Sequence, residues 1–171
     1  MDVRPATCND EAALYEIHRA VFRSHIEQIW GWNEEWQRSN FATELASSSA
    51  LVILIDARIA GYVQFRNEGN RIYVQNIALL PDVQSKGIGT RLIKELQAKA
   101  TVRGVPLELD VFRTNTSARR FYERLGFERM CDTEMHTQMS WSAINEALQP
   151  TALPAGAGKV PSAGFARSGG G

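Results

Sequence analysis

The chain has 171 residues, of which 44% are hydrophobic and 22% charged, a composition typical of one small globular domain with its own core. Lysine plus arginine and aspartate plus glutamate each total 19, so the formal net charge is zero and indicates neither a nucleic-acid partner nor a membrane partner. The two cysteines, Cys8 and Cys131, fit neither a disulfide framework nor a metal site, which favours the reducing cytoplasm. The sequence shows no apolar leader and no apolar run long enough to span a membrane, so we expect a soluble cytoplasmic protein.

The N-terminal third predicts a short strand followed by helices. Residues 2–4 form the strand, and the helix after them carries a stripe of apolar residues at helical spacing, namely Leu14, Ile17 and Val21. His18 is expected on the exposed face of this helix. The segment 25–41 is rich in tryptophan and contains Gly31, so it predicts two short helical pieces with a bend between them.

The middle of the chain changes from helical to strand periodicity. Residues 51–55 are continuously apolar and rich in β-branched side chains, which is typical of a buried strand. Two further strands, 59–66 and 71–79, follow after turn sequences and complete a meander. Residues 87–100 then form an amphipathic helix that Gly104 and Pro106 bring to an end.

The last part of the domain predicts a strand at 107–112, a helix at 116–125 ended by Gly126, and a final hairpin. After Leu148 the sequence consists largely of Pro, Ala, Gly and Ser, which bury too little apolar surface to offset the entropy of ordering. We therefore divide the chain into a domain of residues 1–148 and a disordered tail of residues 149–171.

The segment Gln84–Thr90, which reads QSKGIGT, joins a strand to the amphipathic helix. The start of a helix offers N–H groups without intrahelical partners, and Gly87 and Gly89 let an anion approach the backbone closely. Phosphate binding is one interpretation, and a tight turn that packs the helix on the strand is the alternative. Two other phosphate-binding motifs do not fit. The segment lacks the third glycine of the dinucleotide-binding motif and the Gly-Lys-Ser/Thr of the nucleoside-triphosphate loop.

These residues resemble the GNAT superfamily of N-acetyltransferases. Its signature, Gln/Arg-x-x-Gly-x-Gly/Ala, is matched by Gln84, Gly87 and Gly89 after a strand that closes in an apolar residue and Pro81. A second element downstream is also similar: Asn115-Thr116-Ser117-Ala118 precedes Phe121–Phe127, which reads FYERLGF. The detailed resemblance covers about residues 73–128.

The resemblance implies an α/β fold: a mixed, mostly antiparallel sheet of six to seven strands with helices on both faces. The strands before the phosphate loop and after its helix would lie side by side and splay apart. It also implies acetyl-CoA as cosubstrate and no metal. By position, backbone groups of Ile77, Ala78 and Leu79 would bind the pantetheine arm, and the pyrophosphate would lie on Gln84, Ser85, Lys86, Gly87, Ile88, Gly89 and Thr90. Asn115, Ala118 and Tyr122 would complete the cofactor site.

Ser85 departs from the family pattern, because many relatives have glycine at this position. If the loop needs a positive φ there, serine would be strained. Tyr122 is the candidate general acid for the departing thiolate, the alternative being a core aromatic. The strand before the loop, where some relatives carry the general base, contains no acid. Candidates elsewhere for the base are Glu27, Glu108, Asp110, Glu134 and His136, or a chain of water molecules; among the side chains Glu27 is our choice.

The tryptophan-rich segment suggests a wall for the acceptor. Aromatic faces attract cations, so Trp30 and Trp32, together with Glu27, are candidate substrate contacts. The alternative is that the tryptophans pack on the sheet as part of the core, and for Trp30 we favour this alternative. The sequence thus predicts an N-acetyltransferase, a monomer or homodimer, that acts on an amine-bearing acceptor and binds no nucleic acid or membrane. A non-catalytic acyl-CoA-binding regulatory module and a plain structural domain are the alternatives.

Overall fold

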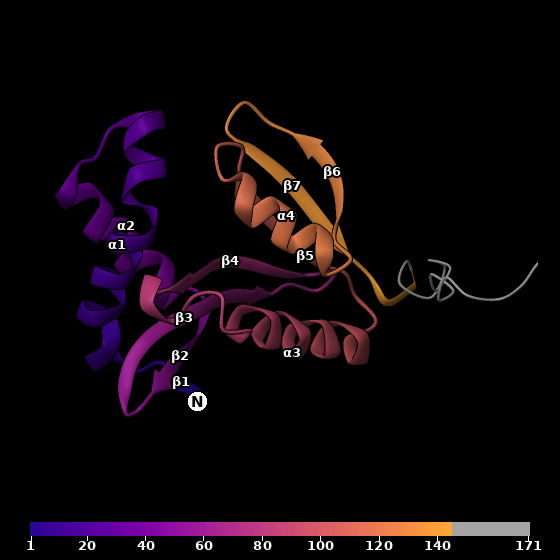
Figure 1. Ribbon diagram of the computed structural model, residues 1–171, viewed down its shortest axis with the longest axis horizontal. Helices are drawn as coiled ribbons and strands as arrows, with labels where there is room; N and C mark the ends of the chain where they lie inside the picture. The colour runs from indigo at the N-terminus through magenta and orange to yellow at the C-terminus, as the bar shows by residue number, and fades with distance from the viewer. Residues whose placement is uncertain (145–171) are drawn as a thin grey trace, which may run out of the picture.

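Seven strands form one mixed sheet in the order β1-β2-β3-β4-β5-β7-β6 in the computed structural model, which describes residues 1–144 (Figure 1). The strands are Asp2–Pro5 (β1), Ser49–Ile55 (β2), Arg58–Asn67 (β3), Ile72–Leu79 (β4), Leu107–Phe112 (β5), Glu128–Asp132 (β6) and His136–Trp141 (β7). Only β4 and β5 pair in parallel; every other neighbouring pair is antiparallel. The predicted sheet type is confirmed.

In the part of the chain that the structure describes, four helices flank the sheet: Glu11–Trp30 (α1), Glu34–Ala46 (α2), Ile88–Arg103 (α3) and Thr116–Arg124 (α4). Single 3-10 turns at Cys8–Asp10 (η1) and Pro81–Val83 (η2) precede α1 and α3. The predicted bend lies at Gly31, whose φ of 77° ends α1. Asn33 then starts α2, since its side-chain oxygen accepts a hydrogen bond from the Trp36 backbone N–H at 2.9 Å.

The helices cover both faces of the sheet, as predicted. Successive residues of β3 face opposite sides: Tyr62 packs with residues of α1 and α2, and Val63 packs with residues of α3 and α4. Both side chains are at most 1% exposed. Within residues 1–144 no helix has the length and apolar character needed to cross a membrane. The predicted tail lies outside the described residues.

His18 corrects one prediction, because it is buried and not on the exposed face of α1. It is 8% exposed, lies between the rings of Phe22 and Phe41, and its Nδ1 is 2.9 Å from the hydroxyl of Tyr62. Burial lowers the pKa of His18 to about 4, so the imidazole is neutral at pH 7. His18 is one helical turn from Leu14, and the apolar stripe of α1 therefore includes it.

The parallel pair β4 and β5 is short. Ile72, Tyr73 and Val74 pair with Leu107, Glu108 and Leu109, and no pairing continues beyond them. Past Val74, β4 stays on β3 while β5 stays on β7, so the two ribbons diverge (Figure 1). A β-bulge marks this point: Asn76 lies opposite Gln64 and Val74 opposite Phe65, which leaves Gln75 as the extra residue. The predicted splay is present, and we call this point the fork.

Candidate active site

The loop Gln84–Gly87 joins β4 and η2 to α3 in an open backbone conformation. Gln84 folds back, and its Nε2 donates to the Leu79 carbonyl at 2.8 Å. Ser85 has a φ of 60° and Gly87 a φ of 77°, both in the left-handed region that favours glycine. The strain anticipated for Ser85 is therefore real. A Cβ built on Gly87 would meet no atom within 4 Å, so this stretch of backbone faces open space.

The N-terminus of α3 offers a site for an anion. The first helical bond runs from the Arg91 N–H to the Gly87 carbonyl at 3.0 Å, so the N–H groups of Ile88, Gly89 and Thr90 have no partner within the helix. The first turn contains no acidic residue that could neutralise the helix dipole. Gly89 has a second role, because a Cβ there would lie 3.2 Å from Cζ of Phe121 on α4.

One edge of β4 beyond the fork is free for pairing. The Leu80 N–H donates to the Ala60 carbonyl of β3 at 2.9 Å, and backbone groups of alternate residues face alternate sides. The backbone groups of Ile77 and Leu79 therefore face away from β3, toward the side that β5 has left. The backbone of Ala78 faces β3, and its side chain is fully buried. Of the three predicted strand contacts, Ile77 and the N–H of Leu79 therefore face the open side, whereas the Leu79 carbonyl on that side already accepts from Gln84.

Helix α4 brings Tyr122 to the same side of the sheet as α3. Asn115 caps this helix, since its Oδ1 accepts from the Ala118 N–H at 3.1 Å, which leaves its amide nitrogen to donate elsewhere. The Tyr122 ring packs against Phe121 and Phe127, with centroids 5.1 and 5.5 Å away. Burial raises the pKa of Tyr122 to about 12. Its hydroxyl makes no hydrogen bond to any of residues 1–144.

Polar side chains gather on the opposite face at the fork. Asp110 is the first residue of β5 past the paired segment, and its Oδ2 accepts a hydrogen bond from the Tyr73 hydroxyl at 2.8 Å. Glu108, on the same face of β5, is instead paired with Arg71 at 2.8 Å. Of the carboxylates predicted as bases, Asp110 is therefore the one at the fork that has no cationic partner within the described chain.

An aromatic cluster lies next along β5. Phe112 follows Asp110 on the same face, and its ring lies 5.8 Å from His25, 6.2 Å from Trp30 and 4.8 Å from His136. These rings join the end of α1 to the ends of β5 and β7 nearest the open side of the fork. Trp30 is 58% exposed, so the preferred expectation that it packs in the core is wrong, and the exposed face is available for a ligand.

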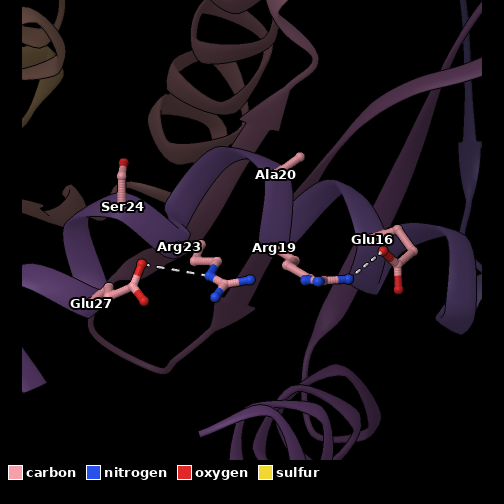
Figure 2. A pocket seen from close by; sticks show the side chains of 6 residues that line it. All are labelled: Glu16, Arg19, Ala20, Arg23, Ser24 and Glu27. Atoms are coloured by element: carbon pink, nitrogen blue, oxygen red, sulfur yellow. Dashed lines mark hydrogen bonds and ion pairs between the residues drawn. The ribbon is translucent and has the colours of Figure 1, made fainter. Parts of the chain in front are cut away.

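Glu27 and Trp32 are not brought to the fork. Glu27 belongs to a row of exposed residues along α1 with Arg23, 3.6 Å away, and this row lies opposite the buried stripe of the helix (Figure 2). The Trp32 indole N–H donates to Glu34 at 2.7 Å, and Arg23 lies over its ring. Tyr73 and Phe112 reach the fork without having been predicted. For Phe112 the available signal was its period-two spacing from Asp110 on β5, whereas the position of Tyr73 depends on the β4–β5 register.

Comparison with known proteins assigns this arrangement to a family. The model of the acetyltransferase (GNAT) family matches residues 12–127, which include both sequence motifs. An N-acetyltransferase of Methanocaldococcus jannaschii, named as uncharacterised, is 30% identical over 133 residues, covering 74% of this chain and 78% of its own.

Solved structures have the same fold. The PaiA N-acetyltransferase of Thermoplasma acidophilum, solved in complex with coenzyme A, superposes with a TM-score of 0.67 at 19% identity, covering 82% of this chain and 98% of that one. The ribosomal-protein-S18-alanine N-acetyltransferase of Escherichia coli gives a TM-score of 0.63 at 21% identity, with 81% and 90% covered.

Proposed function

Because the chain belongs to the GNAT family of acetyltransferases, we propose that it transfers the acetyl group of acetyl-CoA directly to a primary amine of a second bound substrate. The observation that carries this proposal is that three features border the fork: the open helix terminus of α3, the free edge of β4, and the Tyr122 hydroxyl, which has no hydrogen-bond partner among the described residues.

The described residues fit an acyl-CoA. The pyrophosphate would accept hydrogen bonds from the free N–H groups at the start of α3, with Ser85, Lys86 and Gly87 forming the loop around it. The pantetheine amides would pair with the backbone of Ile77 and Leu79 in the place that β5 has left. Ala118 and the amide nitrogen of Asn115 would contact the other side of the arm. The proposal of acetyl-CoA as cosubstrate rests on this match.

Acetyl-CoA supplies the acyl group activated as a thioester. The amine nitrogen attacks the carbonyl carbon, a carbon–nitrogen bond forms, the carbon–sulfur bond breaks and the amine loses one proton. Backbone N–H groups at the bulge of β4 would stabilise the negative charge that develops on the carbonyl oxygen. The Tyr122 hydroxyl would donate to the departing sulfur. With a pKa of about 12 it stays protonated at neutral pH and is always ready to donate.

Asp110 is a better candidate than Glu27 for the group that takes the amine proton. It lies at the fork, is exposed to solvent, and its orientation is fixed by the Tyr73 hydroxyl at 2.8 Å. Glu27 points away from the sheet and is paired with Arg23. We therefore expect Asp110→Asn to lower turnover at least tenfold, while Glu27→Gln leaves it unchanged; the reverse result would restore Glu27 as the base.

The acceptor would enter along the face that carries Asp110. Trp30, with the cluster of Phe112 and His136, borders the open side of the fork and would hold the carbon skeleton of the amine or attract its charge.

Release of the coenzyme A thiol tests the proposal. Purified protein is mixed with acetyl-CoA and each member of a panel of amines: peptides with free N-termini, lysine, polyamines, aminoglycosides and amino acids. The expected result is thiol release that depends on both the protein and one class of amine, with the acetylated amine found by mass spectrometry. Binding of acetyl-CoA without thiol release from any amine would instead indicate a non-catalytic acyl-CoA-binding module.

A further inference from the structure

A hollow of about 310 Å³ opens on the sheet face that carries Asp110. Its lining spans five strands, with Arg66 from β3, Tyr73 from β4, Glu108 and Asp110 from β5, Gln138 from β7 and Met130 from β6. The register explains the arrangement: Arg66 lies beside Tyr73, which lies beside Glu108, and Asp110 lies beside Gln138. The hollow therefore begins at the fork and extends over Tyr73 toward the closed part of the sheet.

The two arginines at this hollow differ in how their charges are satisfied. Arg71 is fully engaged, with hydrogen bonds of 2.6 Å to Glu68 and 2.8 Å to Glu108. Arg66 has only a long contact, 3.4 Å from Nε to Glu68, and this Nε is buried without a hydrogen-bond partner. Its terminal nitrogens have no partner in the described part of the chain. The guanidinium lies over the Tyr73 ring, 5.3 Å from the centroid.

Within residues 1–144 the hollow thus carries one carboxylate without a cationic partner, Asp110, and one guanidinium, Arg66, that is held to Glu68 only through its Nε, on either side of Tyr73. Among the described residues the Asp110 carboxylate meets no cation and the terminal nitrogens of Arg66 meet no anion, so the two groups together complement a ligand that carries both charges. The planar guanidinium of an arginine can bind a carboxylate through two parallel hydrogen bonds. A single ammonium group cannot form this paired geometry.

We infer that the acceptor is a small amino carboxylate, whose amine lies at Asp110 and whose carboxylate binds the terminal nitrogens of Arg66. This inference rests on the proposed function and names the substrate class of the same site. Tyr73 positions both ends, since its hydroxyl holds Asp110 and its ring supports Arg66. Simple alkylamines and polyamines lack the anionic group and are expected to be poor acceptors.

Matched pairs of amines test this inference. Glycine, 4-aminobutanoate and 6-aminohexanoate are each compared with the alkylamine of the same carbon chain, and kcat/KM is measured by thiol release. For at least one chain length the wild-type protein should prefer the amino carboxylate tenfold or more. In Arg66→Gln, which keeps the first three side-chain carbons and a polar end but removes the charged guanidinium, the preference should fall toward one through a higher KM. Arg38→Ala is the control, because Arg38 stacks on Tyr15 in a similar way but is remote from the hollow.

The outcome separates this inference from the proposed function. Acetylation of amines with no preference for any amino carboxylate, or a preference that survives in Arg66→Gln, would overturn the inference and leave the acetyltransferase intact. Calorimetry of the same amino carboxylates with protein saturated by coenzyme A reads binding without turnover. Binding that is weakened tenfold in Arg66→Gln supports the inference, and the absence of binding at millimolar concentrations overturns it.

Discussion

Replacing Tyr122 by phenylalanine removes one hydroxyl and leaves the packing of the ring unchanged. In the structure this hydroxyl makes no hydrogen bond to residues 1–144, while the ring contacts Phe121 and Phe127. A structural tyrosine would lose about 1 kcal/mol of stability on losing its hydrogen bond. Tyr122→Phe has no such bond to lose, so its free energy of unfolding should stay within about 0.5 kcal/mol of the wild type.

The expected loss of rate follows from the pKa of Tyr122, which is about 12. A thiol titrates near 8.5, so full transfer of the phenolic proton to the thiolate would be unfavourable by about 5 kcal/mol. The hydroxyl therefore acts as a hydrogen-bond donor to the developing negative charge on sulfur. Such a bond contributes about 1.5–3 kcal/mol, which corresponds to a rate roughly 10- to 150-fold lower in Tyr122→Phe.

The assay is single-turnover thiol release with the best acceptor from the amine panel, combined with urea unfolding. Tyr15→Phe is the control, because the Tyr15 hydroxyl donates to Glu34 at 2.8 Å in the remote α1–α2 corner. It should lose stability and keep its rate, the opposite of Tyr122→Phe. An undiminished single-turnover rate in a stable Tyr122→Phe protein would refute the assignment of the donor.

Three further predictions concern stability. Burial lowers the pKa of His18 to about 4, so between pH 6.5 and 4 the unfolded chain binds a proton at this residue that the folded protein does not bind. The free energy of unfolding should therefore fall by up to about 3 kcal/mol as the pH is lowered across this window. Urea titrations should find this loss smaller in His18→Gln, and an equal loss in both proteins would exclude His18 as its source. Gly61→Ala places a Cβ against the backbone carbonyl oxygen of Ala78, which cannot move aside, and thermal melts should show a destabilisation of about 1–3 kcal/mol; a wild-type Tm would contradict this. Deletion of the residues after Leu148 should leave both the Tm and the affinity for coenzyme A unchanged, whereas a clear fall in either would assign the tail a role.

Most of the fold could be predicted from the sequence because its elements are marked by local signals. Four glycines with positive φ lie at the ends of helices, namely Gly31, Gly87, Gly104 and Gly126, and the strand segments are rich in β-branched residues. His18 was misplaced because a polar side chain on an apolar stripe gives no sign of its burial; the partner that makes burial tolerable, Tyr62, is 44 residues away. Trp30 was expected in the core on its apolar character alone, although it lies off the buried stripe of α1.

The cofactor side of the site could be predicted better than the acceptor side. The loop Gln84–Thr90 and helix α4 carry contiguous motifs, and each is built from residues close in the chain. The acceptor side depends on register: Asp110 meets Tyr73, and Arg66 lies beside Tyr73, only because of how β3, β4 and β5 pair. The spacing of residues in the sequence does not reveal this strand register. The β-bulge at Gln75 also shifts the register between β3 and β4 by one residue.

Calorimetric titration of acetyl-CoA into Gly87→Asp and Gly87→Asn tests the central claim that the start of α3 holds the pyrophosphate. Aspartate and asparagine have the same shape and both tolerate the left-handed conformation of this position, so the two variants differ in charge alone. One negative charge about 5 Å from the pyrophosphate costs about 3 kcal/mol at an effective dielectric constant near 20, or roughly a hundredfold in Kd. We expect the Kd of Gly87→Asp to be at least a hundredfold above that of Gly87→Asn at low salt. Equal affinities in two folded proteins would contradict it.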